Sequence, residues 1–264
     1  MNRDEGINVK ESFLCTAVRF YGSLIVIGGI FLCLDIGSWV LRQCVSNGAR
    51  RQRIGRRWLH SLARLSVWYL HKVGILDCEA QDLHALRAEK SVILVANHPS
   101  RLDSLILAAM LPQMVCVTKS SIWERPIFGS TLQTAGYIRH DTLLRVLAPA
   151  SAHLQAGGQV LIFPEGTRAH AGASPNPLQT GFAAIAQCTG VPIQVVLIET
   201  TNPYLSQGWR YYKIPPLPIA YRISLGPRFL APSRDEASAR ALVEQVESWF
   251  KKAFMKNEMV HDDA

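Results

Sequence analysis

The sequence predicts an α/β fold: a mixed, largely parallel sheet flanked by helices and preceded by an N-terminal membrane-anchoring helical segment. Three observations support this prediction. Short apolar runs rich in β-branched residues are typical of buried strands, and they lie at residues 92–96, 115–118, 159–163 and 191–198. Segments with helical spacing of apolar residues lie between these runs. A long apolar stretch precedes all of them.

The composition favours a protein that contacts a membrane. Of its 264 residues 48% are hydrophobic, which is ample for one large domain or two small ones. The charged fraction of 18% is below the usual quarter, and the mean hydropathy is +0.11. A net charge of +8 predicts an anionic partner, either nucleic acid or anionic lipid. The six cysteines show no CxxC pair and no zinc-type spacing, so we expect reduced thiols in a cytosolic setting.

The long apolar stretch at residues 20–41 contains one ionisable residue, Asp35. A helix over this stretch would be about 33 Å long, enough to cross a bilayer core of about 30 Å. The stretch starts late and no small-x-small cleavage site comes after it, so we expect an uncleaved transmembrane helix rather than a signal peptide. A carboxylate in hydrocarbon costs a few kcal/mol, so the alternative is a helix that enters one leaflet or turns back.

A strongly basic segment comes directly after the apolar stretch. Its arginines are Arg42, Arg50, Arg51, Arg53, Arg56 and Arg57. The positive-inside rule then places the rest of the chain on the cytoplasmic face, in a bacterium that of the inner membrane. Residues 58–73 show the spacing of an amphipathic helix, which either packs on the domain or touches the membrane interface. We therefore divide the chain into a membrane anchor with a basic, amphipathic segment, 1–74, and a catalytic domain, 75–264.

Within the domain the elements can be taken in chain order. Residues 75–90 predict a polar connector with a short helix, and residues 92–96 a strand that leads into a helix from 101 to 110. Further strands are expected at 115–118, after Gly136, at 159–163, at 191–198 and at 219–225. Further helices are expected at 147–156 and 178–188, and after the capping box S-R-D-E at 233–236. Residues 169–177 predict a flexible loop, and residues 200–218 a long aromatic loop.

The strand at 92–96 leads into the most informative stretch of the chain. Pro99 ends the strand and suits the first position of a helix, so His98 lies at a strand-to-helix junction, where ligands bind in α/β sheets. With His98 outside the helix, the chain can fold back. The carboxylate of Asp103 then accepts a hydrogen bond from one imidazole nitrogen and leaves the other as a base. A His-x4-Asp spacing alone also arises by chance, and the placement after a buried strand is what favours a functional dyad.

The sequence N-H-P-S-R-L-D at residues 97–103 resembles the first motif, N-H-x4-D, of the lysophospholipid acyltransferase family, which includes the 1-acylglycerol-3-phosphate acyltransferases. Three later segments resemble further motifs of that family in the same order. Lys119, P-I-F-G at 126–129 and G-Y-I at 136–138 resemble the second motif. F-P-E-G-T-R at 163–168 resembles the third, and the strand at 191–198, with its Pro192, the fourth. The resemblance covers roughly residues 75 to 228.

The resemblance implies an enzyme that moves a fatty acyl group from an acyl thioester, acyl-CoA or acyl carrier protein, to the free hydroxyl of lysophosphatidic acid, making phosphatidic acid. It implies that His98 is the general base and that Asp103 holds it. No cofactor other than the thioester co-substrate and no metal is expected. The expected partners are membrane lipids, the lysophospholipid acceptor and the acyl donor, but no nucleic acid. We expect substrate binding by Asn97, Arg101, Lys119, Glu165, Gly166, Thr167 and Arg168.

One position departs from the family pattern. The second motif usually ends in an arginine that contacts the phosphate of the acceptor, and Thr142 stands at that position. Arg139 and Arg145 are near but out of register. Two alternatives therefore stay open: an O-acyltransferase for a lysolipid without phosphate, such as lyso-ornithine, and a non-enzymatic basic membrane-binding protein.

Overall fold

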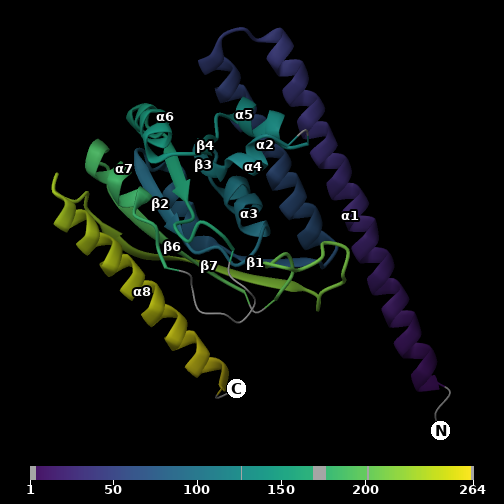
Figure 1. The fold of residues 1–264 in the computed structure, drawn as a ribbon. Helices are drawn as coiled ribbons and strands as arrows, with labels where there is room; N and C mark the ends of the chain where they lie inside the picture. The colour runs from purple at the N-terminus through teal and green to yellow at the C-terminus, as the bar shows by residue number, and fades with distance from the viewer. Residues whose placement is uncertain (1–3, 126, 169–176, 201, 263–264) are drawn as a thin grey trace.

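A computed structural model describes residues 4–125, 127–168, 177–200 and 202–262 of the chain. Seven strands of this part form one sheet in the order β1-β7-β6-β2-β5-β3-β4 (Figure 1). Neighbouring strands are parallel, except that β7 is antiparallel to β6. The strands are Leu76–Glu79 (β1), Val92–Ala96 (β2), Met114–Lys119 (β3), Ile138–His140 (β4), Gln159–Ile162 (β5), Ile193–Glu199 (β6) and Ile219–Phe229 (β7).

Helices lie on both sides of the sheet, as predicted. The α-helices are Asp4–Cys44 (α1), Gly48–Lys72 (α2), Leu102–Met110 (α3), Ser120–Trp123 (α4), Gly129–Ala135 (α5), Leu143–Gln155 (α6), Gly181–Thr189 (α7) and Glu236–Asp262 (α8), and Gln81–Ala88 is a 3₁₀ helix (η1). On one side α7 contacts both α6 and α8, and on the other α2 packs against α3 and α5, with α1 outermost (Figure 1). The predicted α/β architecture with a mixed, largely parallel sheet is confirmed.

The burial of the strands explains their sequences. β2 lies inside the sheet with helices over both faces, and every one of its side chains is buried, which a continuous apolar run satisfies. β7 lies next to the edge of the sheet. Its buried Ile219, Tyr221 and Ile223 alternate with the exposed Ala220 and Arg222, which is the period-two pattern seen in the sequence.

One element of the sheet is not predicted by the sequence. Residues 75–90 contain, besides the expected short helix η1, the edge strand β1, which pairs in parallel with β7. Its sequence, L-D-C-E, carries too little apolar alternation to signal a strand, and the pairing is supplied by β7 from far along the chain. Residues 169–176 of the expected flexible loop, and Pro126 of the second motif, lie outside the described residues.

The segment before the domain is two long helices. α2 packs on α3 and α5 through side chains at helical spacing, and Gly74, at φ +67°, turns the chain from α2 towards β1. The buried residues of α2 are Gly55, Leu59, Ala63, Ser66 and Leu70. Within the described residues one helical stretch, Phe13–Cys44 of α1, is long and apolar enough to cross a membrane, judged by length and composition.

α1 is attached to the domain along much of its length. Near its N-terminal part, the Tyr21 hydroxyl donates to the carbonyl of Tyr212. Further on, Asp35 accepts hydrogen bonds from the backbone N–H of Phe128 (2.8 Å) and from the Thr131 hydroxyl (2.6 Å) at the start of α5. The carboxylate that opposed a simple membrane span therefore has two donors from the domain.

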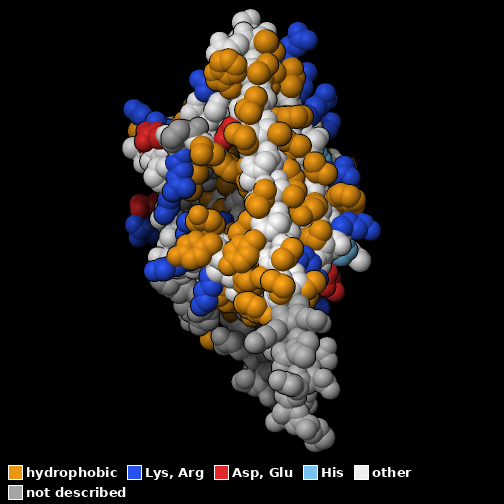
Figure 2. Space-filling model, turned by 90° about the vertical axis from the view of Figure 1, so that its right-hand side faces the viewer, with side chains coloured by type: hydrophobic (Ala, Val, Ile, Leu, Met, Phe, Trp, Pro, Cys, Tyr) orange, Lys and Arg blue, Asp and Glu red, His pale blue; other side chains and the backbone are white. Residues whose placement is uncertain are grey.

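The outer face of α1 is apolar and exposed. Its exposed large apolar side chains are Phe13, Leu14, Val18, Ile25, Val26, Leu32, Ile36, Trp39 and Val40. In α2, Trp58, Leu65 and Trp68 are also exposed. Figure 2 shows apolar side chains gathered over this side of the molecule, with Lys and Arg side chains along its edges. An apolar surface of this size is typical of a site that contacts a membrane or another protein.

Candidate active site

The predicted site residues lie along one edge of the sheet. β2, β3, β5 and β6 run parallel, so their carboxyl ends meet at the same edge. His98 comes after β2, Lys119 ends β3, and the turn at residues 163–168 comes after β5. β5 is the direct neighbour of β2 and therefore brings its turn beside His98. Lys119 lies on the same edge with β5 between it and β2.

His98 and Asp103 form the predicted pair. Nδ1 of His98 lies 2.8 Å from Oδ2 of Asp103, and the same oxygen accepts the backbone N–H of Ser100 at 2.9 Å. The Asp103 carboxylate is fully buried while 17% of the His98 side chain is exposed. An ionised carboxylate only accepts hydrogen bonds, so the proton of the neutral imidazole is on Nδ1 and Nε2 keeps its lone pair. Burial raises the pKa of Asp103, and the hydrogen bond from His98 opposes that rise.

Three neighbours hold His98 in place. The ring of Phe163 stacks on the imidazole with centroids 4.0 Å apart and the planes inclined by 18°. The backbone N–H of His98 donates to Oε1 of the buried Glu165 at 3.1 Å. The Asn97 side chain bonds both the N–H and the carbonyl of Ile198, each at 2.7 Å, and so ties the end of β2 to β6. Asn97 and Glu165, predicted to bind substrate, therefore also fix the turn that carries His98.

The turn after β5 presents a cation at the same place. Gly166 has φ +66°, a backbone conformation that residues with a Cβ rarely adopt, so this position favours glycine. Thr167 is exposed beyond it. Nη1 of Arg168 donates to the carbonyls of Leu205 (2.7 Å) and Ser206 (2.8 Å), which fixes the guanidinium against the loop before β7.

Arg168 and Arg101 lie close enough to affect each other. Burial lowers the pKa of Arg168, and so does the positive charge of the exposed Arg101, whereas Asp103 raises it. Two guanidinium groups that act on each other close to the Asp103 carboxylate are the kind of groups that bind an anion. By contrast, Arg139 and Arg145, the two candidates near the second motif, both pair with Asp141.

Sequence reasoning missed three features of this site. Phe163 is predicted only as part of a strand, although its place in the third motif is a usable signal. The carbonyls of Leu205 and Ser206 come from the aromatic loop, and no sequence pattern marks a backbone acceptor. Tyr221 of β7 lies beside Asp103 and Ser100, whereas its alternation in the sequence indicates only a core position.

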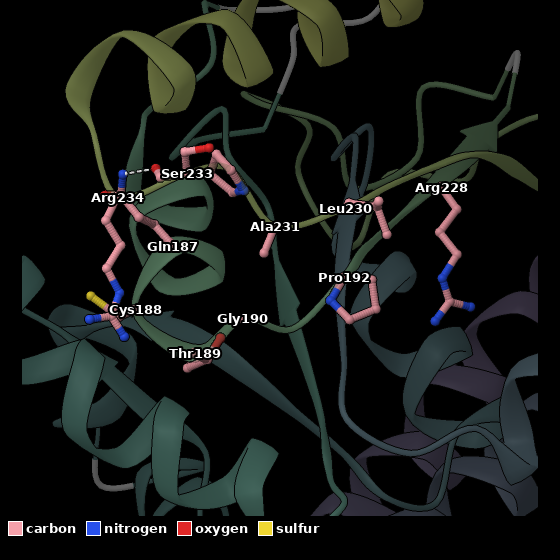
Figure 3. Close-up of a pocket in the computed structure, with 11 residues that line it drawn as sticks. Gln187, Cys188, Thr189, Gly190, Pro192, Arg228, Leu230, Ala231, Ser233 and Arg234 are labelled. Carbon is pink, nitrogen blue, oxygen red and sulfur yellow. Dashed lines mark hydrogen bonds between the residues drawn. The ribbon is translucent and has the colours of Figure 1, made fainter.

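The described part of the chain offers no cluster of three or more His, Cys, Asp or Glu side chains that could hold a metal ion. A cavity of about 560 Å³ lies elsewhere (Figure 3). Cys188 and Gly190 at the end of α7, Pro192 before β6, and Arg228 and Leu230 at the end of β7 line it. It sits at the amino end of β6, so it lies at the opposite edge of the sheet from His98.

Comparisons with known proteins identify an acyltransferase domain in this chain. A family model described as Acyltransferase matches residues 77–199. The chain is 29% identical over 175 residues to the 1-acyl-sn-glycerol-3-phosphate acyltransferase of Helicobacter pylori, covering 64% of this chain and 68% of that protein. It is 24% identical over 207 residues to the enzyme of the same name from Pseudomonas aeruginosa, covering 76% of each chain.

A solved structure has the same fold. The crystal structure of the 1-acyl-sn-glycerophosphate acyltransferase from Thermotoga maritima aligns with a TM-score of 0.63 at 19% identity, covering 94% of this chain and 97% of that one. Fold, dyad and matches together define this chain as an acyltransferase. Its matched domain and the names of these relatives make it similar to the 1-acyl-sn-glycerol-3-phosphate acyltransferases.

Proposed function

We propose that this enzyme transfers a fatty acyl group from an acyl thioester to the free hydroxyl of lysophosphatidic acid and so makes phosphatidic acid. One observation supports it above the others. A histidine with a free Nε2, held by a buried carboxylate, lies beside two arginines that can bind a phosphate. The relatives from Helicobacter pylori and Pseudomonas aeruginosa carry this activity in their names.

The reaction needs one base that also acts as an acid. Nε2 of His98 takes the proton of the acceptor hydroxyl as its oxygen attacks the thioester carbonyl. The tetrahedral intermediate then collapses, the carbon–sulfur bond breaks, and the imidazolium returns the proton to the leaving thiolate. Asp103 stabilises the imidazolium between these steps and keeps the ring oriented. The acceptor itself is the nucleophile, so no acyl-enzyme is formed.

Arg168 and Arg101 would hold the phosphate of the acceptor. A phosphate monoester carries a charge of about −1.5 to −2 near neutral pH, so one cation leaves part of it unbalanced. The family's second-motif arginine is replaced by Thr142, and Arg139 and Arg145 are engaged with Asp141. We therefore assign the second cation to Arg101, which the first motif supplies directly beside the dyad.

An assay with a substrate panel tests this function. Purified enzyme in detergent micelles would be given lysophosphatidic acid, lysophosphatidylcholine or a lyso-ornithine lipid, each with acyl-CoA and with acyl carrier protein as donor. Products would be identified by mass spectrometry. We expect phosphatidic acid from lysophosphatidic acid, and none from the His98→Ala enzyme. Acylation of the lyso-ornithine lipid alone would contradict this proposal and favour an acceptor without phosphate. The donor that supports the reaction would show whether the enzyme uses acyl-CoA or acyl carrier protein.

We also propose that α1 lies along one leaflet rather than across the bilayer. It contacts the domain at points from Tyr21 to Arg42, whose guanidinium donates to Gln133. A helix held against the domain over that length cannot cross the bilayer unless the domain enters it too. Its exposed apolar face, continued by α2, would then be buried in the acyl region, with the flanking arginines at the anionic headgroups.

Two measurements on membranes test this placement. Protease added to inverted and to right-side-out vesicles should digest the domain only when the cytoplasmic face is outside, because the anionic lipids of the cytoplasmic leaflet attract the flanking arginines. Quenching of Trp39 fluorescence by lipids brominated at different depths should place this exposed side chain in the outer acyl region. Digestion of the domain only in right-side-out vesicles would overturn the orientation, and quenching of Trp39 at the bilayer centre would restore a spanning helix.

A further inference from the structure

Two polar atoms at the dyad are buried without a hydrogen-bond partner among the described residues. One is Oδ1 of Asp103, the carboxylate oxygen that does not face His98, and the other is the hydroxyl of Tyr221. Their residues are 0% and 3% exposed, so bulk solvent does not reach them. An unpaired buried polar group costs about 1–3 kcal/mol, and more if it is charged. A buried donor and a buried acceptor that lie side by side are therefore expected to form a hydrogen bond with each other.

These two groups are neighbours. The negative charge of Asp103, after burial, is the largest cause that raises the pKa of the Tyr221 phenol, and Tyr221 in turn lowers the pKa of Asp103. The phenol is therefore protonated at any working pH and offers one O–H donor. Oδ1 of Asp103 offers a lone pair of a charged acceptor, which is the stronger kind.

The alternative acceptor for the phenol is Ser100. Its hydroxyl already donates to the carbonyl of Tyr204 at 2.8 Å and accepts the backbone N–H of Leu102 at 3.2 Å. The Asp103 oxygen has neither kind of contact. A hydrogen bond from the phenol to Oδ1 of Asp103 would satisfy both of these buried atoms at once.

We infer that Tyr221 donates its hydroxyl hydrogen to Oδ1 of Asp103 and is a positioning residue of the dyad. The inference rests on the proposed function for its catalytic consequence, and for the bond it rests on two buried atoms without a partner whose side chains interact. Asp103 then accepts from His98 Nδ1, Ser100 N–H and Tyr221 O–H, so both of its oxygens are held. β7 thereby takes part in a site otherwise built from the ends of the parallel strands.

The sign of the pH effect depends on the role of the hydroxyl. A hydrogen-bond donor to Asp103 stabilises the form of the dyad with an ionised carboxylate and a neutral imidazole. Removing that donor therefore raises the pH at which the dyad takes up a further proton. Since the free base is the active form, the acid limb of the kcat profile should move to higher pH. A hydrogen bond to a charged group corresponds to a shift of about one pH unit or somewhat more.

Tyr221→Phe tests the inference, because it removes one oxygen and keeps the ring that fills the core. We expect the acid limb of kcat to rise by about one pH unit, with the KM for the acceptor nearly unchanged. Tyr137→Phe is the matched control, since Tyr137 is also buried but precedes β4 at the opposite side of the sheet. Its profile should coincide with that of the wild type. A Tyr221→Phe profile that also coincides would overturn the inference.

A second measurement does not depend on activity. The change in melting temperature would be recorded for Tyr221→Phe, for Asp103→Asn and for the double variant. If the hydroxyl serves the carboxylate, the effects of the two changes are not additive, because either one removes the charge-assisted bond. Additive effects would show that the hydroxyl serves Ser100 or nothing. This result stands even if lysophosphatidic acid is not the substrate, so the two proposals can fail separately.

Discussion

Two carboxylates of this protein are held in nearly the same way and serve different ends. Asp103 accepts the backbone N–H of Ser100 and a hydrogen bond from His98. Asp35 accepts the backbone N–H of Phe128 and a hydrogen bond from a side chain, that of Thr131. Asp103 lies in the first turn of α3, and Asp35 accepts both of its hydrogen bonds from the start of α5, so each carboxylate is near a helix N-terminus, where the helix dipole favours negative charge.

The difference lies in what else each carboxylate holds. The partner of Asp103 is an imidazole, a side chain that can act both as a base and as an acid. The partner of Asp35 is a hydroxyl, which cannot. Asp103 is fully buried, whereas Asp35 is half-buried between α1 and α5. Similar hydrogen bonding therefore orients an imidazole in one place and ties α1 to α5 in the other.

The largest expected effect is that of replacing His98, the proposed base. His98→Ala should lower kcat by at least about 10²-fold and up to about 10⁴-fold, the range for general acid–base catalysis. The side chain lies at the edge of the sheet, so the melting temperature should change little. Initial rates with lysophosphatidic acid and circular dichroism together check this. Retention of a tenth or more of the wild-type kcat would mean that another group takes the proton.

Asp103→Asn should come next in size. The amide can still accept one hydrogen bond, but it carries no charge to stabilise the imidazolium, and it can offer N–H instead of oxygen to His98. We expect a loss of at least about tenfold and up to about 10³-fold in kcat, with a smaller effect on folding because the volume is conserved. The measurement is kcat across pH alongside thermal unfolding. An unchanged rate would show that His98 does not depend on its carboxylate.

Arg168→Lys should have a moderate and selective effect. It keeps the charge but loses the planar fork that pairs with two oxygens, and its ammonium cannot reproduce the fixed contacts to Leu205 and Ser206. The KM for lysophosphatidic acid should rise by tens-fold, about 2 kcal/mol for charge-assisted bonds, while the KM for the donor hardly changes. Arg139→Lys is the control, because Arg139 is paired with Asp141. Equal increases in this KM for Arg168→Lys and Arg139→Lys would show that Arg168 does not bind the phosphate of the acceptor.

The sequence is most informative where the chemistry is local. The dyad needs only residues 97–103 and the expectation that a helix begins soon after Pro99, so its geometry could be predicted; α3 begins at Leu102 rather than at Pro99. The partnership of Arg101 with Arg168 could not, because it depends on β5 lying next to β2 in the sheet. The same holds for Tyr221, which reaches Asp103 because β7 turns back antiparallel to β6. Contacts between segments distant in the chain leave no periodic signal.

Asp35 shows the same limit, and it gives the smallest predicted effect. In the sequence, Asp35 is a charged residue within an apolar helix, where burial of the charge costs free energy. No sequence pattern predicts the two hydrogen-bond donors from residues 128 and 131. Asparagine is isosteric, so its oxygen can accept from Phe128 N–H and its amide can donate to the Thr131 hydroxyl. Asp35→Asn should therefore leave kcat within about twofold, whereas Asp35→Ala should cost about 1–2 kcal/mol of stability, as for the loss of a helix cap.

Thermal unfolding of the wild type and these two variants in lipid nanodiscs, with kcat measured on the same samples, checks this last expectation. The comparison is direct, because the same Asp→Asn change is made at two carboxylates with the same pattern of donors. At position 103 it should remove activity and spare the fold. At position 35 it should spare both, because asparagine can keep both hydrogen bonds and a threonine hydroxyl neither ionises nor takes up a proton near neutral pH. A fall in kcat at position 35 as large as that at position 103 would mean that α1 takes part in the reaction, and the distinction between a catalytic and a fastening carboxylate would be lost.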